Sequence, residues 1–155
     1  MEPLFIESKQ LLDLASKTTI DAIGKPILES FGEQRRNRVL CDVVIKVGSE
    51  EILAHRCILY AVSKYCETLF TGSPPPTYID GMLVMDLSHF LSDTVQVFID
   101  LVYGETSSKI LMVDIVELLR LGDFLGVPGN FLTEIQVLFL LCKMTHCIFP
   151  SLWTL

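Results

Sequence analysis

The chain has 155 residues, half of them hydrophobic, with a formal net charge of −7 and a pI near 4.8. This length fits one domain with a small extension. The acidic balance argues against nucleic acid as a partner, because phosphate binding requires a basic field. The hydrophobic content supports a core and leaves apolar surface for a dimer interface or an exposed tail.

The cysteines and the N-terminus indicate a reducing compartment. The count of five cysteines is odd, and several of them lie inside apolar patterns, where a free thiol behaves as a small hydrophobe. The sequence has no Asn-x-Ser/Thr sequon and no apolar signal core at its N-terminus. We therefore expect a cytoplasmic or nuclear location. The longest apolar stretch, residues 135–142, is far shorter than the roughly 20 residues that a bilayer requires, so no membrane association is expected.

The first 35 residues predict a helical lead-in. Apolar residues from Leu11 to Ile27 recur at spacings of three and four, and Pro26 is predicted to end or kink the helix. A second short helix would hold Leu28 and Phe31. The apolar stripe is buried only if it packs on its own domain or on a partner. The arginines at 35, 36 and 38 are predicted to form a solvated connector.

The next segments predict short strands. Residues 43–47 and 51–54 indicate a hairpin around Gly48–Ser49, and apolar residues alternate in the first strand as expected of a half-exposed strand. Residues 82–87 predict a third strand.

The clearest helical pattern covers residues 56–70, which carry a nearly continuous apolar face, and residues 71–76 stop that helix. Ser92 and Asp114 are predicted N-caps of two further helices, which end at Tyr103–Gly104 and at Pro128–Gly129. Residues 131–155 are apolar and weakly patterned. We expect that segment to be irregular and to lower solubility.

Several spaced motifs between Leu40 and about Pro128 together resemble the BTB/POZ domain. The matching pieces, in chain order, are Leu40-Cys41-Asp42-Val43, Ala54-His55-Arg56, Ile58-Leu59, Ser63-x-Tyr65, Leu69-Phe70-Thr71-Gly72, Phe98-Ile99-x-Leu101-Val102-Tyr103-Gly104 and Asp114-Ile115-Val116-Glu117-Leu118-Leu119-x-x-x-Asp123-Phe124-Leu125. The resemblance implies an α/β fold, a helical cluster flanked by short strands, with an N-terminal lead-in helix. We expect a lead-in over residues 1–35, a BTB/POZ domain over 36–129 and a divergent apolar tail over 130–155.

The lead-in, about residues 9–32, is similar to the helix that precedes the domain in the kelch-like branch, where it often swaps across a homodimer. That branch carries a BACK region and a kelch propeller, and it commonly serves as a substrate adaptor of cullin-based ubiquitin ligases. The resemblance implies a protein that homodimerises, or pairs with related BTB proteins, and docks a cullin scaffold. The sequence stops where a BACK region would begin, so we expect a truncated form.

The resemblance also points to candidate contact residues. Cullin-binding members often carry a hydrophobic-x-Glu motif after the long helix, and Tyr78-Ile79-Asp80 stands at that place with a shorter acid. His89 and Phe90 lie in a segment that borders the cullin-facing surface in the family. These five residues are the candidate cullin contacts.

Asp42 and Arg56 match an acid and a base that form a charged pocket near the dimer interface in several BTB proteins. We expect them either to act as a specificity device for dimerisation or corepressor contact, or to support the fold as an ordinary ion pair. A partly buried pair would cost about 3–5 kcal/mol to break. Corepressor contact by this pocket gives one alternative function, a transcriptional or scaffolding BTB protein that recruits a corepressor. The lack of a propeller gives another, a truncated form that competes for dimerisation.

No pattern indicates catalysis, a cofactor or a metal. We expect His55 to be a hydrogen-bonded core histidine, because its neighbours are apolar and buried polar groups are normally satisfied. Asp86, Ser88, His89 and Asp93 are expected at a strand end, a loop and a helix cap, since no nucleophile elbow, metalloprotease helix or phosphate loop accompanies them. Cys142, His146 and Cys147 offer three soft ligands, whereas zinc usually takes four. The chain is not expected to be an enzyme.

Overall fold

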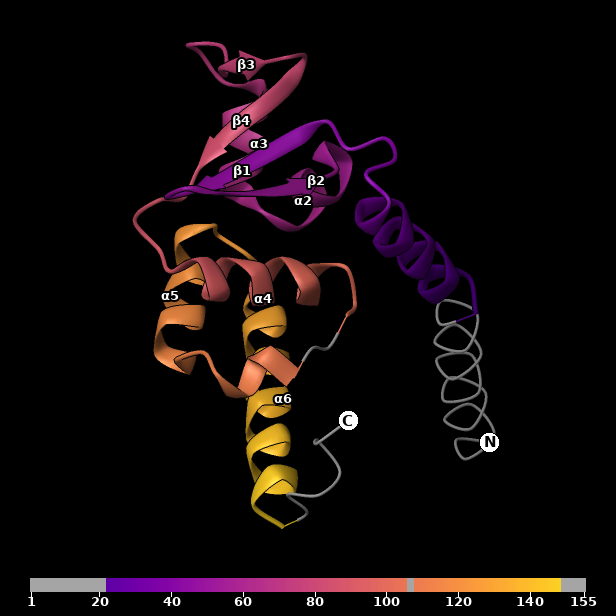
Figure 1. Cartoon of the computed structure of the whole chain (residues 1–155), viewed down its shortest axis with the longest axis vertical. Coiled ribbons are helices and arrows are strands. Elements are labelled where there is room, and N and C mark those ends of the chain that lie inside the picture. The colour runs from indigo at the N-terminus through magenta and orange to yellow at the C-terminus, as the bar shows by residue number, and fades with distance from the viewer. Residues whose placement is uncertain (1–21, 106–107, 149–155) are drawn as a thin grey trace, which may run out of the picture.

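The computed structural model describes residues 22–105 and 108–148 of the chain (Figure 1). The first described element is a helix over residues 22–36. The elements that follow are β1 (Val43–Val47), β2 (Glu50–Ala54), α2 (Arg56–Val62), α3 (Lys64–Thr71), β3 (Tyr78–Ile79), β4 (Met82–Asp86), α4 (Ser92–Val102), the 3₁₀ helix η1 (Ser108–Leu111), α5 (Ile115–Phe124) and α6 (Gly129–Ile148). The predicted α/β class is confirmed.

The strands form one mixed sheet in the order β2-β1-β4-β3. β1 and β2 form the predicted antiparallel hairpin, whose turn uses Gly48 at φ 61°, and β4 runs parallel to β1. Val44 of β1 is as buried as Val43 and Ile45. The expected half-exposed strand is therefore wrong, because β1 has a neighbouring strand on each side and both of its faces are covered.

The helix predicted over residues 56–70 is instead two helices, α2 and α3, which meet at Ser63. The Ser63 backbone is extended, and its Oγ accepts a hydrogen bond from the backbone N–H of Cys66, which makes Ser63 the N-cap of α3. The same hydroxyl donates to the carbonyl of Leu125 at 2.7 Å, and the backbone N–H of Lys64 donates to the carbonyl of Gly126. The break thus ties α3 to the end of α5.

The helix boundaries confirm some of the predicted signals and contradict others. Asp114 caps α5 by accepting from the backbone N–H of Val116, as predicted. Ser92 is wrong as a cap, since α4 begins with it and its hydroxyl donates to Glu50 of β2 instead. Pro26 ends no helix, because residues 22–36 are continuously helical. Pro26 has no N–H to donate to the carbonyl of Ala22. Ala22 is exposed, so water can solvate that carbonyl instead.

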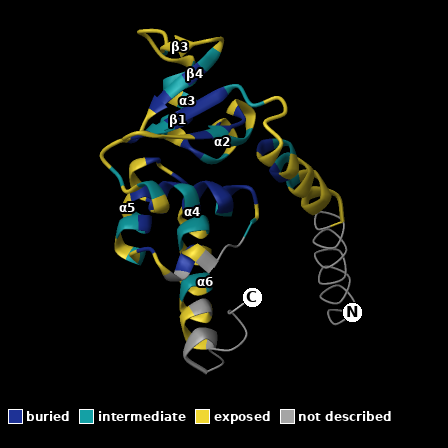
Figure 2. Cartoon of the chain, viewed as in Figure 1, coloured by how far each residue is buried: buried dark blue, intermediate teal, exposed yellow. Residues whose placement is uncertain are grey.

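Residues 129–148 are helical rather than irregular, contrary to expectation. Ile135 is buried in the core, and Phe131, Leu132, Leu138 and Phe139 pack against it partly buried. α6 packs on α5 and η1 through its first turns, and the figures show its later turns extending beyond the rest of the helical group (Figures 1 and 2). No helix among the described residues is long and apolar enough to cross a membrane.

Candidate functional site

The C-terminal end of the first helix is fixed to α4 by Arg35. Its side chain is only 8% exposed, and Nη2 donates to Asp100 Oδ1 at 2.5 Å and to Glu105 Oε2 at 3.3 Å. The guanidinium also lies 4.9 Å from the ring centre of Tyr103. The expectation of a solvated connector is therefore wrong for Arg35, although Arg36, which also binds Glu105, is largely exposed.

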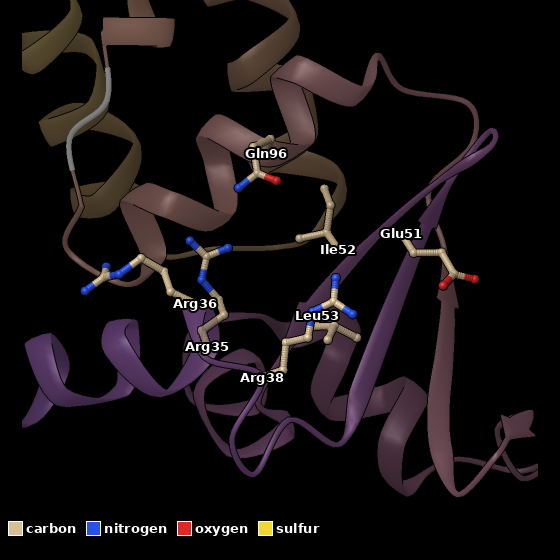
Figure 3. A pocket seen from close by; sticks show the side chains of 7 residues that line it. All are labelled: Arg35, Arg36, Arg38, Glu51, Ile52, Leu53 and Gln96. Atoms are coloured by element: carbon tan, nitrogen blue, oxygen red, sulfur yellow. The ribbon is translucent and has the colours of Figure 1, made fainter.

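Figure 3 shows a small surface cavity beside this anchor, lined by Arg35, Arg36, Arg38, Gln96 and residues 51–53 of β2, with a volume of about 210 Å³. Its basic character is largely neutralised. Asp100 and Glu105 hold Arg35 and Arg36, as described above, and the Gln96 amide also donates to Asp100. The arrangement serves to position the first helix rather than to hold an anion.

The first described turns of this helix, at the end away from Arg35, have an uncovered apolar face. Ile23 is 59% exposed and Ile27 is 52% exposed, and the turns that hold them stand apart from the α4–α6 group (Figures 1 and 2). Only the last turns contact the body, where the Phe31 ring packs edge-on against His55 with a centroid distance of 5.3 Å. The helix is fixed to the domain at one end, and its exposed isoleucines at the other end provide apolar surface that a partner chain can contact.

Asp42 and Arg56 do form an ion pair, at 3.4 Å between Asp42 Oδ2 and Arg56 Nε. The side chains are 42% and 46% exposed respectively, so the cost of 3–5 kcal/mol expected for a partly buried pair is too high for this site. Asp42 Oδ1 also accepts the backbone N–H of Arg56 at 2.6 Å. Since that N–H belongs to the first turn of α2, Asp42 acts as a cap supplied from another segment.

Both residues of the pair line a larger cavity of about 500 Å³, together with Cys57, Tyr60, Phe70 and Thr71. Arg56 Nη1 donates a hydrogen bond to the Tyr78 hydroxyl at 3.4 Å, so the hairpin of β3 and β4 closes one side of the same region. Tyr60 and Tyr78 are exposed. The structure thus joins Tyr78, predicted as a cullin contact, with the charged pair rather than with His89.

His55 is a buried core histidine, as predicted, and its hydrogen bonds define its tautomer. The Tyr103 hydroxyl lies 2.8 Å from the backbone N of His55 and 2.8 Å from its Nδ1. Because that hydroxyl accepts the backbone N–H, it donates to Nδ1, and Nε2 then donates to the Val39 carbonyl at 3.0 Å.

Cys41 Sγ lies 3.8 Å from the same Nε2, which carries a hydrogen and therefore offers no base to the thiol. Burial raises the pKa of Cys41, and the charge of Arg35 offsets this only in part. A raised pKa keeps the sulfur protonated and weakly nucleophilic. This Cys–His contact is structural and supports no nucleophilic chemistry.

His89 and Phe90 lie in a cluster of rings that joins the loop after β4 to α5 and α3. Ring centroids are 4.4 Å apart for His89 and Phe90, 5.0 Å for His89 and Phe124, and 5.0 Å for Tyr65 and Phe124. The loop is further held by Glu117, whose Oε1 accepts the backbone N–H of Leu91 at 3.2 Å. The loop and α5 thus present one rigid surface.

That surface, here called the α5 face, comprises His89, Leu91, Val116, Arg120 and Phe124. Leu91 is 64%, Val116 53% and Phe124 41% exposed. Sequence reasoning missed Leu91, Val116 and Phe124 as candidates. The spacing of Val116, Arg120 and Phe124, four residues apart and therefore on one side of a helix, is the signal that could have found Val116 and Phe124; no such signal marks Leu91.

The predicted contacts Ile79 and Asp80 stand apart from the α5 face. Ile79 is 45% exposed and pairs with Met82 at the beginning of β4, whereas His89 follows the end of that strand. Asp80 occupies the turn with φ 51°, followed by Gly81 with φ 81°. The five candidate contacts therefore fall into two groups at opposite ends of β4.

The described residues contain no group of three or more His, Cys, Asp or Glu side chains placed to hold a metal ion. The side chains of Cys142, His146 and Cys147 lie outside the described part of the structure. Interaction with the Ser88 side chain, together with the hydrogen bond that Asp86 accepts from the Ser88 backbone N–H in the turn after β4, lowers the pKa of the Asp86 carboxyl. Asp86 and Ser88 are therefore the end of a strand and part of the loop that follows it, as predicted.

Comparison with known proteins agrees with this architecture. The family model described as "BTB/POZ domain" matches residues 31–134, and the chain belongs to this family. The BTB domain of zebrafish PATZ1 has a similar solved structure, with a TM-score of 0.57 and 23% identity over 74% of this chain and 89% of that one. This likeness confirms the fold.

Two kinds of relative share the domain. Zinc finger and BTB domain-containing protein 7A of Gallus gallus is 31% identical over 103 residues, or 66% of this chain and 18% of that protein. Kelch repeat and BTB domain-containing protein 2 of Ectromelia virus (strain Moscow) is 38% identical over 103 residues, with the same two coverages. The chain spans less than a fifth of the length of these curated relatives. Its shared part is the BTB domain, a protein-interaction module.

Proposed function

We propose that the chain is a dimerising adaptor module that docks a cullin scaffold of a ubiquitin ligase through the α5 face. The observation that supports this proposal is the exposed apolar surface of the α5 face. Leu91, Val116 and Phe124 leave apolar surface exposed on a rigid support of packed rings and a hydrogen-bonded loop. Exposed apolar residues grouped on one rigid surface are typical of sites for protein partners. The kelch and BTB relative favours the adaptor interpretation.

The dimer is supported by the first helix. BTB domains generally dimerise, and the exposed Ile23 and Ile27 provide apolar surface for a second copy. Each isoleucine would contribute about 1–2 kcal/mol if an interface buried the exposed half of its side chain. Sedimentation of Ile23→Glu and Ile27→Glu variants tests this. We expect the double variant to be monomeric at concentrations where the parent chain is dimeric, and an unchanged dimer would exclude this helix from the interface.

Calorimetric titration with the N-terminal domain of a BTB-binding cullin tests the docking. Leu91→Arg and Val116→Arg introduce a charge at exposed positions and leave the core intact, so they should each weaken binding by at least tenfold, about 1.4 kcal/mol. Leu140→Arg, an equally exposed apolar position on α6, is the matched control and should bind like the parent. If the dimeric parent gives no heat of binding, the cullin proposal is wrong.

The charged cavity favours a second candidate, recruitment of a corepressor. It combines an ion pair with the exposed Tyr60 and Tyr78 around about 500 Å³, and zinc finger and BTB proteins are among the relatives. A reporter assay with the chain fused to a heterologous DNA-binding domain tests it. Repression by the parent that is lost on Arg56→Glu supports corepressor recruitment, and a fusion without any repression excludes it.

A further inference from the structure

Three consecutive prolines, residues 74–76, connect α3 to β3 on the surface of the domain. Pro74 and Pro75 are exposed, and Pro76 is partly exposed. Because β3 is an outermost strand of the sheet, this connector lies at an edge of the domain, away from the α4–α6 group (Figures 1 and 2). Among the described residues, no backbone N–H donates to the carbonyls of these prolines. The connector is therefore open to another molecule.

The proline sequence restricts the backbone of the connector to one conformation. The proline ring holds φ at about −65°, and a residue that precedes a proline favours the extended or polyproline II region. Pro74 and Pro75 meet both conditions. A polyproline II helix has no internal hydrogen bonds and leaves its carbonyls free, as the structure shows for this connector. A preformed segment of this kind loses little conformational entropy when a partner binds it.

Tyr78 follows Pro75 by three residues and is 51% exposed. Continued through Thr77, the polyproline II conformation has three residues per turn, which places Pro75 and Tyr78 on the same side, about 9 Å apart. The Tyr78 hydroxyl accepts one hydrogen bond, from Arg56 at 3.4 Å. A bond of that length between exposed groups costs little to give up. The Thr77 carbonyl accepts the backbone N–H of Val84 at 2.8 Å, which fixes the end of the connector to β4.

We propose that Pro75-Pro76-Thr77-Tyr78 is a docking motif for a small domain of the WW class, which recognises polyproline II segments through an aromatic-lined groove. Proline rings pack on the aromatic side chains of such a groove. Tyr78 adds a large ring with a polar hydroxyl on the same side, where a second pocket of the groove can hold it. SH3 domains bind prolines at the spacing Pro-x-x-Pro, and no two prolines of the connector have that spacing. The sequence of the connector therefore favours the WW class.

This motif lies apart from the α5 face. Tyr78 pairs with Leu83 near the beginning of β4, whereas the loop that carries His89 and Leu91 follows the end of that strand. Docking of a WW domain therefore goes beyond the proposed cullin docking and does not depend on it.

Calorimetric titration of the whole chain with an isolated WW domain that binds Pro-Pro-x-Tyr peptides tests the motif. We expect saturable binding of one WW domain per chain. Pro75→Ala and Tyr78→Ala should each weaken binding by at least tenfold. Pro74→Ala removes an exposed proline just outside the motif, so it is the matched control and should bind like the parent. No binding by the parent, or equal weakening by Pro74→Ala and Pro75→Ala, would overturn the proposal.

Two further measurements keep the test decisive. Tyr78 belongs to β3, so if circular dichroism shows that Tyr78→Ala loses structure, Pro75→Ala, which lies outside the strands, decides the outcome. Leu91→Arg, in the α5 face, should bind the WW domain like the parent, and weaker binding would place the WW domain on the wrong surface. An SH3 domain that binds Pro-x-x-Pro peptides should not bind the chain. Equally tight binding of both domains would contradict a motif of the WW class.

Discussion

Replacing Arg35 by Met tests whether the buried anchor holds the first helix on the domain. Methionine keeps most of the apolar packing over Tyr103 and removes the charge, which leaves Asp100 buried with Gln96 as its remaining donor. Breaking a buried ion pair costs about 3–5 kcal/mol. Because Gln96 still satisfies one carboxylate oxygen, we expect the lower end, about 3 kcal/mol, or roughly 10 °C in Tm for a domain of this size.

Arg36→Met is the matched control, since it removes the same charge from the next residue. Arg36 is 57% exposed, so its loss should cost about 0.5 kcal/mol or less. The assay is urea unfolding at a fixed chain concentration, because dimerisation makes stability depend on concentration. Asp100→Asn combined with Arg35→Met should cost about 2 kcal/mol less than the sum of the single changes. Equal destabilisation by the two arginine variants, or strict additivity with Asp100→Asn, would refute the reasoning.

Three other predictions concern the core and the charged pair. Asp42→Ala should cost about 1–2 kcal/mol and more than Arg56→Ala in thermal unfolding, because Asp42 also caps α2 through a backbone N–H; the reverse order would contradict the cap. Tyr103→Phe should cost about 1–3 kcal/mol in the same assay, since it leaves the backbone N–H and Nδ1 of buried His55 without their partner, and a neutral change would contradict these bonds. Burial raises the pKa of Tyr103 to about 12 and of Cys66 to about 11. The unfolded chain therefore releases these protons at lower pH than the folded chain. We expect the free energy of unfolding to keep its full value below about pH 9 and to fall as the pH rises toward 12. Unfolding free energies that stay constant from about pH 9 to 12 would contradict this prediction.

The sequence predicted those features that depend on neighbouring residues. The hairpin of β1 and β2 follows from two short apolar runs on either side of the turn at Gly48, and the cap at Asp114 follows from a side chain that binds a backbone N–H two residues on. The core position of His55 was predicted from its apolar neighbours. The BTB/POZ fold was predicted from the order of several motifs, each of them short.

The features that were missed depend on residues far apart in the chain. The break at Ser63 is stabilised by the carbonyl of Leu125, 62 residues later, and the burial of Arg35 depends on Asp100, 65 residues later. The local sequence pattern cannot reveal such partners. The apolar face continues on both sides of Ser63, which predicts one helix, and Arg35 belongs to a short basic run, which predicts a solvated segment. The four-residue spacing of Val116, Arg120 and Phe124 marks the part of the α5 face that lies on the helix. Its junction with Leu91 and His89 could not be predicted locally, since the loop after β4 and α5 come together only in the fold.

The most direct test of the account is light scattering of the chain after size-exclusion chromatography, alone and mixed with the N-terminal domain of a BTB-binding cullin. The account predicts twice the 17.4 kDa chain mass alone and, in the mixture, an earlier peak that contains two chains and two cullin domains. A folded monomer whose elution the cullin domain does not change would contradict both the dimer and the docking.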